Sequence, residues 1–122
     1  MAGDLDRWLE PRLAGAPREL AEAVRALLRE SAADSRESSS DVPEVLAAAA
    51  MRGFDGVLSQ ADPPREAALR LLAADAALTY AFEAAAALGR DVDALALRMG
   101  PSGELGRRLE SQRPGPAAGG AP

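Results

Sequence analysis

The stretch LRLLAADAALTYAFEAAAALG, residues 69–89, decides the fold because it is the longest apolar stretch of the chain. It consists mainly of alanine and leucine, which favour helix strongly, and it closes on a glycine, a residue common just past a helix end. Upstream, residues 61–64 read ADPP, where the aspartate can cap a helix and the prolines suit its first turn. These signals predict one unbroken helix over residues 63–88, about 39 Å long, around which the fold is organised.

The composition predicts an all-α protein with a thin core. Of the 122 residues, 48% are hydrophobic and 3% are aromatic, and half of the hydrophobic residues are alanine. A buried large apolar side chain contributes roughly 1.5–3 kcal/mol, and alanine contributes far less. We expect a single helical domain over residues 1–112, built as a compact bundle of four to five helices, and a disordered tail over residues 113–122. A core this thin also favours stabilisation by a partner chain.

The remaining helices follow from apolar spacing and capping signals. The pattern predicts a short helix after Asp4, which Pro11 should kink or end, and a second helix over residues 17–32. Residues 41–44, DVPE, resemble a capping box that opens a helix reaching residue 59. Residues 91–99 allow a helix or a strand, and we prefer the helix because a lone strand would have no partner. A last short helix is expected over residues 102–112, and residues 33–41 are expected to form an exposed serine-rich loop.

Two glycines and a tryptophan predict specific packing. Gly53 and Gly56 lie inside the expected 41–59 helix, where each glycine costs about 1 kcal/mol of helix stability relative to alanine. Close approach of another helix, or a kink near Gly53, would account for them. Trp8, the only tryptophan, is expected to anchor the core or an interface.

The absent residue types exclude several kinds of chemistry. The chain has no cysteine and no histidine, which excludes disulfides, thiolate nucleophiles, histidine bases and zinc sites built from these ligands. We therefore expect no metal and no cofactor. A net charge of −5 argues against a nucleic-acid partner. The chain contains no run of 18 residues without a charged residue, so no membrane span is predicted. With an acidic start and no signal-peptide pattern, the expected location is the cytoplasm, and the use of arginine in place of lysine suggests a GC-rich bacterial source.

Asp75 is the one acid in the middle of the long apolar helix. On a helical wheel it falls on the face of Leu71, Leu78 and Phe82, with Thr79 and Glu83 following at four-residue steps. The opposite face is almost entirely alanine, from Ala74 to Ala85. Both faces differ from ordinary surface, so we expect the helix to be contacted on two sides.

A buried carboxylate needs a partner, because an unpaired one would cost several kcal/mol or raise its own pKa. Arg52 is the first candidate within the domain, which would make Asp75 part of a structural ion pair. The alternative is a polar groove for a ligand or a partner, lined by Asp75, Thr79 and Glu83. The carboxylates of Asp75 and Glu83 lie about 12 Å apart along the helix, too far to share one metal ion without further ligands.

Residues 72–83, LAADAALTYAFE, resemble a helix that recurs in trans-polyprenyl diphosphate synthases, with Ala74 where that family usually has glycine. The resemblance covers these 12 residues of the chain. The family holds diphosphate through magnesium at two aspartate-rich motifs, and this chain has no adjacent pair of aspartates. The resemblance implies at most a non-catalytic relative, and we transfer no catalytic residue from it.

Together these patterns predict a small helical interaction or assembly protein without enzymatic activity. Its expected partner is a second copy of itself, in a homodimer or larger oligomer, or another protein bound through its helix faces. The alternative is a helical protein that binds or converts a small molecule through Asp75 and Glu83, as a degenerate relative of the polyprenyl diphosphate synthases.

Overall fold

A computed structural model describes residues 3–34, 41–59 and 63–112, which form six helices and no strand. The helices are α1 (Asp4–Ala14), α2 (Arg18–Asp34), α3 (Val42–Leu58), α4 (Pro64–Ala87), α5 (Val92–Met99) and α6 (Glu104–Gln112). The all-α fold class is therefore confirmed. The predicted tail over residues 113–122 lies outside the described residues, as do residues 35–40 of the predicted loop.

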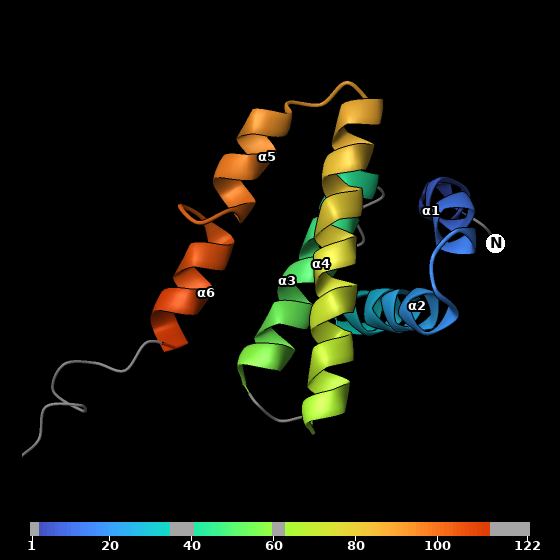
Figure 1. Cartoon of the computed structure of the whole chain (residues 1–122). Coiled ribbons are helices and arrows are strands. Elements are labelled where there is room, and N and C mark those ends of the chain that lie inside the picture. The colour runs from blue at the N-terminus through green and yellow to red at the C-terminus, as the bar shows by residue number, and fades with distance from the viewer. Residues whose placement is uncertain (1–2, 35–40, 60–62, 113–122) are drawn as a thin grey trace, which may run out of the picture.

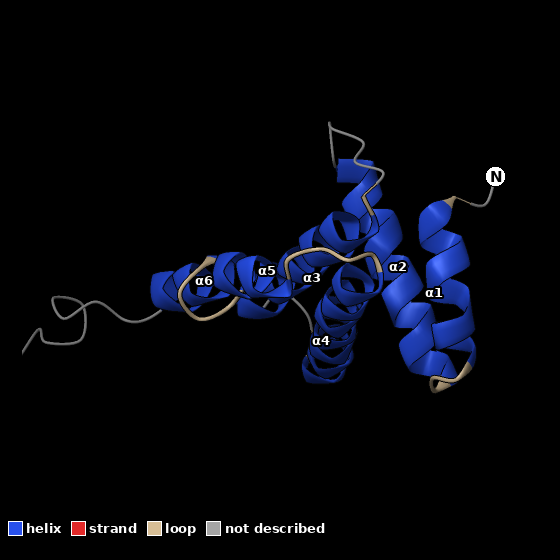
Figure 2. Cartoon of the chain, turned by 90° about the horizontal axis from the view of Figure 1, so that it is seen from above, coloured by secondary structure: helices blue, strands red, loops and turns tan. Residues whose placement is uncertain are grey.

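The centre of the molecule is an antiparallel pair formed by α3 and α4 (Figure 1). Seen from above, α1 and α2 lie on one side of this pair, and α5 and α6 lie on the other (Figure 2). The 24-residue helix α4 is unbroken, as predicted for residues 63–88. None of the helices in the described part of the chain is long and apolar enough to span a membrane.

Small residues bring α3 and α4 close together. The buried side of α4 consists of alanines alone, and it includes Ala74, Ala77 and Ala81. A Cβ atom added to Gly53 of α3 would lie only 2.8 Å from the Cβ of Ala74, so glycine is what permits this approach. The predicted contact between a glycine of the 41–59 helix and the alanine face is thus present, and α3 continues past Gly53 as a single helix.

Larger side chains fill the space beside this pair. Leu9 and Leu13 of α1, Val24 and Leu27 of α2 and Leu46 of α3 are all nearly inaccessible to solvent. Trp8 is half-buried at the edge of this core, where its ring meets Tyr80 of α4 edge-on at 6.2 Å between centroids. The predicted anchoring role of Trp8 is therefore consistent with its position.

The end of α4 is tied to the start of α3. Gly89 has a φ of 70°, a left-handed conformation that glycine adopts without strain. The backbone N–H groups of Gly89 and Arg90 donate to the carbonyls of Ala86 and Ala85, which together form a Schellman motif. This turn places the Arg90 guanidinium 2.6 Å from the Asp41 carboxylate at the N-terminus of α3.

Three local predictions need correction. Helix α1 continues through Pro11 to Ala14, and α2 continues to Asp34, so the first two residues of the predicted 33–41 loop are helical. Asp41 does occupy the N-cap position, but its carboxylate binds Arg90 and accepts no backbone N–H of its own helix. By contrast, residues 92–99 form the predicted helix, and the Asp91 carboxylate accepts the N–H of Ala94 at 3.0 Å.

Candidate functional site

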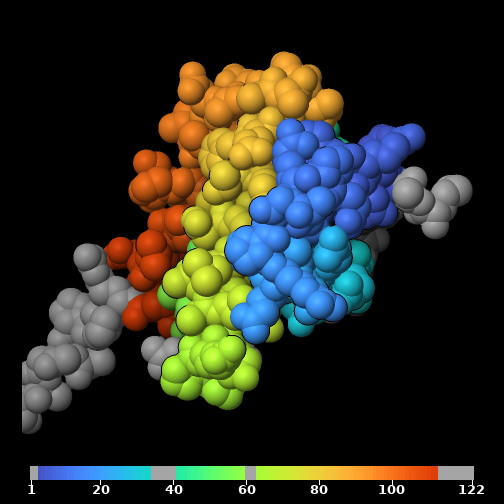
Figure 3. Space-filling model, turned by 45° about the vertical axis from the view of Figure 1, so that its right-hand side comes forward, coloured from blue at the N-terminus to red at the C-terminus, as the bar shows by residue number. Residues whose placement is uncertain are grey.

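The side of α4 opposite its alanine face is open to solvent and mostly apolar. Leu71 and Leu72 are 45% and 57% exposed, and Phe82, about three turns further along the helix, is half-buried. No helix lies in front of this side in Figure 1, and in the space-filling view it separates α1 and α2 from α5 and α6 (Figure 3). We call it the α4 outer face; it consists of Ala68, Leu71, Leu72, Asp75, Thr79, Phe82 and Ala86.

Asp75 lies on this outer face and is exposed, so the prediction that it is buried was wrong. No ion pair joins it to Arg52, although both residues belong to the described chain. The physical reason is that the alanine face of α4 turns toward α3, because small side chains allow the closer helix approach. That rotation directs the larger apolar residues and Asp75 outward, so the helix is not sandwiched on both sides as expected.

The predicted polar groove of Asp75, Thr79 and Glu83 is only partly assembled. Thr79 lies next to Asp75, and its Oγ1 donates a hydrogen bond of 3.0 Å to the backbone carbonyl of Asp75. Glu83 turns toward α1 instead, where its carboxylate accepts from Nε of Arg12 at 3.2 Å. The guanidinium of Arg12 in turn lies 3.6 Å from the ring centroid of Trp8.

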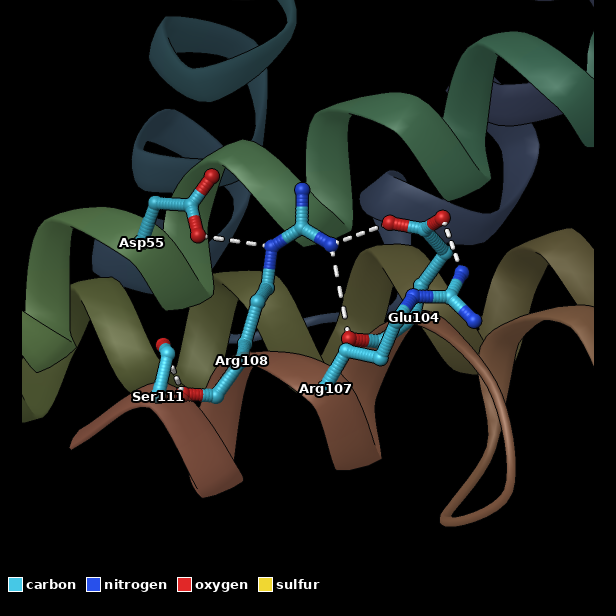
Figure 4. Close-up of polar contacts among 5 residues, drawn as sticks. All are labelled: Asp55, Glu104, Arg107, Arg108 and Ser111. Atoms are coloured by element: carbon cyan, nitrogen blue, oxygen red, sulfur yellow. Dashed lines mark hydrogen bonds and ion pairs between the residues drawn. The ribbon is translucent and has the colours of Figure 1, made fainter. Parts of the chain in front are cut away.

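A cluster of ion pairs at α6 was not predicted from the sequence. Arg108 donates to Asp55 of α3 at 2.6 Å and to Glu104 at 2.5 Å, and Arg107 also donates to Glu104 (Figure 4). These hydrogen bonds, the one from Arg108 foremost, lower the pKa of the Glu104 carboxyl. The four-residue step from Glu104 to Arg108 was a visible signal, whereas Asp55 and Arg108 are 53 positions apart and only the fold unites them.

A hollow next to this cluster is lined by cations that already have carboxylate partners. It has a volume of about 700 Å³ and lies between α3 and the α5–α6 segment, with Arg98 and Arg107 in its wall. Arg98 binds both carboxylate oxygens of Glu44, and Arg107 binds Glu104. The first pair joins α5 to α3, the second lies within α6, and both guanidinium groups already have a carboxylate partner. Within the described residues, no group of three acidic, histidine or cysteine side chains could hold a metal ion.

Comparisons with known proteins do not bear on this site. No family model, curated protein or solved structure matches the chain. The α4 outer face is thus the candidate functional site on physical grounds: it combines exposed leucines with a central position in the fold.

Proposed function

We propose that this protein is a non-enzymatic assembly protein that associates with a second copy of itself through the α4 outer face. The observation that supports this proposal is the exposure of Leu71 and Leu72 in the middle of the central helix. Large leucines at the centre of the fold contribute to stability only when something covers them. Exposed apolar side chains that lie together, as Leu71 and Leu72 do on this face, mark interaction sites.

The thinness of the core also supports self-association. The α3–α4 contact is made largely by alanine and glycine, which bury little apolar area per residue. Covering the outer face in an oligomer would add the larger side chains that the monomer leaves in water. The absence of histidine and cysteine from the sequence supports a role without catalysis, and the absence of disulfides supports a location in the cytoplasm.

Size-exclusion chromatography with light scattering tests the proposal. We expect the wild-type chain to elute with at least twice the mass of one chain. We expect Leu72→Glu to shift it to the mass of one chain, because the interface would have to bury a charge. Circular dichroism should show unchanged helicity, since Leu72 is exposed in the monomer.

Leu97→Glu is the matched control. Leu97 of α5 is 69% exposed, more than Leu72, but it does not belong to the α4 outer face. It should leave the mass of the oligomer unchanged. A wild-type chain that elutes with the mass of one chain at every concentration would contradict self-association. An oligomer that Leu97→Glu disrupts and Leu72→Glu does not would place the interface elsewhere.

A further inference from the structure

Six of the seven residues of the α4 outer face, all except Leu71, form a seam whose chemistry reads the same in both directions. Their spacing alternates between four and three positions, which keeps them on one side of a helix. In order along the chain they are Ala68, Leu72, Asp75, Thr79, Phe82 and Ala86. By chemistry the order is small, large apolar, polar, polar, large apolar, small. The midpoint of this chemical palindrome is Ala77, which lies on the buried side of the same helix.

A palindromic seam fits one kind of partner. In an interface with two-fold symmetry, the same surface of both subunits must be complementary to itself. When two α4 helices run antiparallel with their midpoints aligned, each residue meets its counterpart from the other end of the seam. Leu72 then faces Phe82 of the partner subunit, Asp75 faces Thr79 of the partner subunit, and Ala68 faces Ala86 of the partner subunit.

From this pairing we infer that α4 packs antiparallel against α4 of a second copy, in the register centred on Ala77. This inference rests on the proposed self-association and specifies its geometry. The paired leucine and phenylalanine bury apolar surface in two layers. The alanines at both ends allow the helices to approach closely. The Thr79 hydroxyl, which now donates to a carbonyl of its own helix, can instead donate to the Asp75 carboxylate of the partner subunit.

Charge disfavours the parallel arrangement. In a parallel pair each seam residue would face itself, and the two Asp75 carboxylates would meet across the interface with like charge. In the antiparallel register the two aspartates lie on opposite sides of the symmetry axis, four positions apart, which separates them by about 6 Å along the helix. Asp75 has no ion pair among the residues that the structure describes, so the hydroxyl of Thr79 is the partner that this register offers.

Single-cysteine cross-linking tests the orientation, and the natural chain contains no cysteine that would interfere. Ala68→Cys and Ala86→Cys change exposed alanines 18 positions apart, about 27 Å along the helix. Each full-length variant is treated with a short thiol-reactive linker alone and after mixing with the other. The linked peptides are identified by mass spectrometry after tryptic digestion, which separates the two sites at Arg70.

In the antiparallel register, the mixture should yield a dimer linked between the two different sites, and neither variant alone should link to itself. Ala96→Cys, on an exposed position of α5, should give no link and serves as the control. Self-linking of each variant alone would show a parallel pair and overturn the inference, while self-association stands. An oligomer without any link at either site would place the interface elsewhere and overturn it too. A chain with the mass of one subunit would contradict the proposed function itself.

Discussion

Gly53 occupies the position where α3 and α4 come closest. A Cβ atom there would lie 3.0 Å from a methyl carbon of Leu27 and 2.8 Å from the Cβ of Ala74, which cannot move away without displacing α4. Overpacking of this kind costs roughly 1–3 kcal/mol, more than the about 1 kcal/mol that alanine adds to helix propensity. We expect Gly53→Ala to lower the free energy of unfolding, measured by urea denaturation.

Gly56→Ala is the control for this substitution. The added Cβ would meet the side chain of Arg70, which is flexible, so the variant should be as stable as the wild type or more stable. Equal stability of the two variants would show that Gly53 is not needed for the close approach of the helices.

Replacement of Asp75, unlike that of Gly53, should hardly change the free energy of unfolding. Because it is exposed and has no ion pair within the described residues, Asp75→Asn should change the free energy of unfolding by less than about 0.5 kcal/mol. Unfolding is measured at high dilution, where we expect a monomer whose outer face is not covered. A loss on the order of 3 kcal/mol, as expected when a buried ion pair is broken, would instead support the structural ion pair that the sequence predicted.

At the scale of elements, α6 is held to α3 by charge. None of the residues of α6 is buried, and its side chains reach Asp55 through Arg108. The pKa of Glu104 is lowered by its hydrogen bonds from Arg108 and Arg107, so Glu104 contributes stability above its unfolded pKa and loses it as the pH falls through the folded value. Both partners of Glu104 lie in α6 itself, so acid should weaken this helix before the rest of the bundle unfolds.

Hydrogen exchange of the backbone amides measures this loss of helix stability. Protection of α6, corrected for intrinsic exchange rates, should be present at neutral pH and should fall as the pH drops below the ordinary carboxyl pKa. Protection of α3 and α4 should persist longer. Glu104→Gln should reduce the protection of α6 already at neutral pH, and equal protection in this variant and the wild type would show that the ion pairs of Glu104 do not stabilise α6.

The helices were predictable from the sequence because their signals are local. Alanine-rich segments, the proline at the start of α4 and Gly89 at its end delimit elements without reference to the rest of the chain. The direction in which α4 faces was not predictable, because neither of its sides is strongly polar. Area alone favours burying the leucines, whereas close approach to Gly53 favours burying the alanines, and only the packed structure shows which prevails.

The sequence indicated which residues the candidate site contains, but not how exposed they are or which residues they contact. Asp75 and Thr79 were singled out and do lie together, but on an exposed face where a buried ion pair was expected. Glu83 was assigned to the same groove, and its pairing with Arg12 depends on how α1 docks, which links positions 71 apart. Contacts of this kind arise from the whole fold and have no signature in the local sequence.

At the scale of the whole molecule, α4 has two different sides. Its alanine face forms the centre of the monomer, and its outer face presents a symmetrical seam of larger residues. We therefore expect a monomer that folds on its own and a dimer that forms when two outer faces cover each other.

A dilution series of the wild-type chain, followed by sedimentation velocity and by circular dichroism, tests this claim most directly. We predict that the mass falls from two chains to one as the protein is diluted, while the helical signal stays constant. A mass of one chain at every concentration would contradict the account.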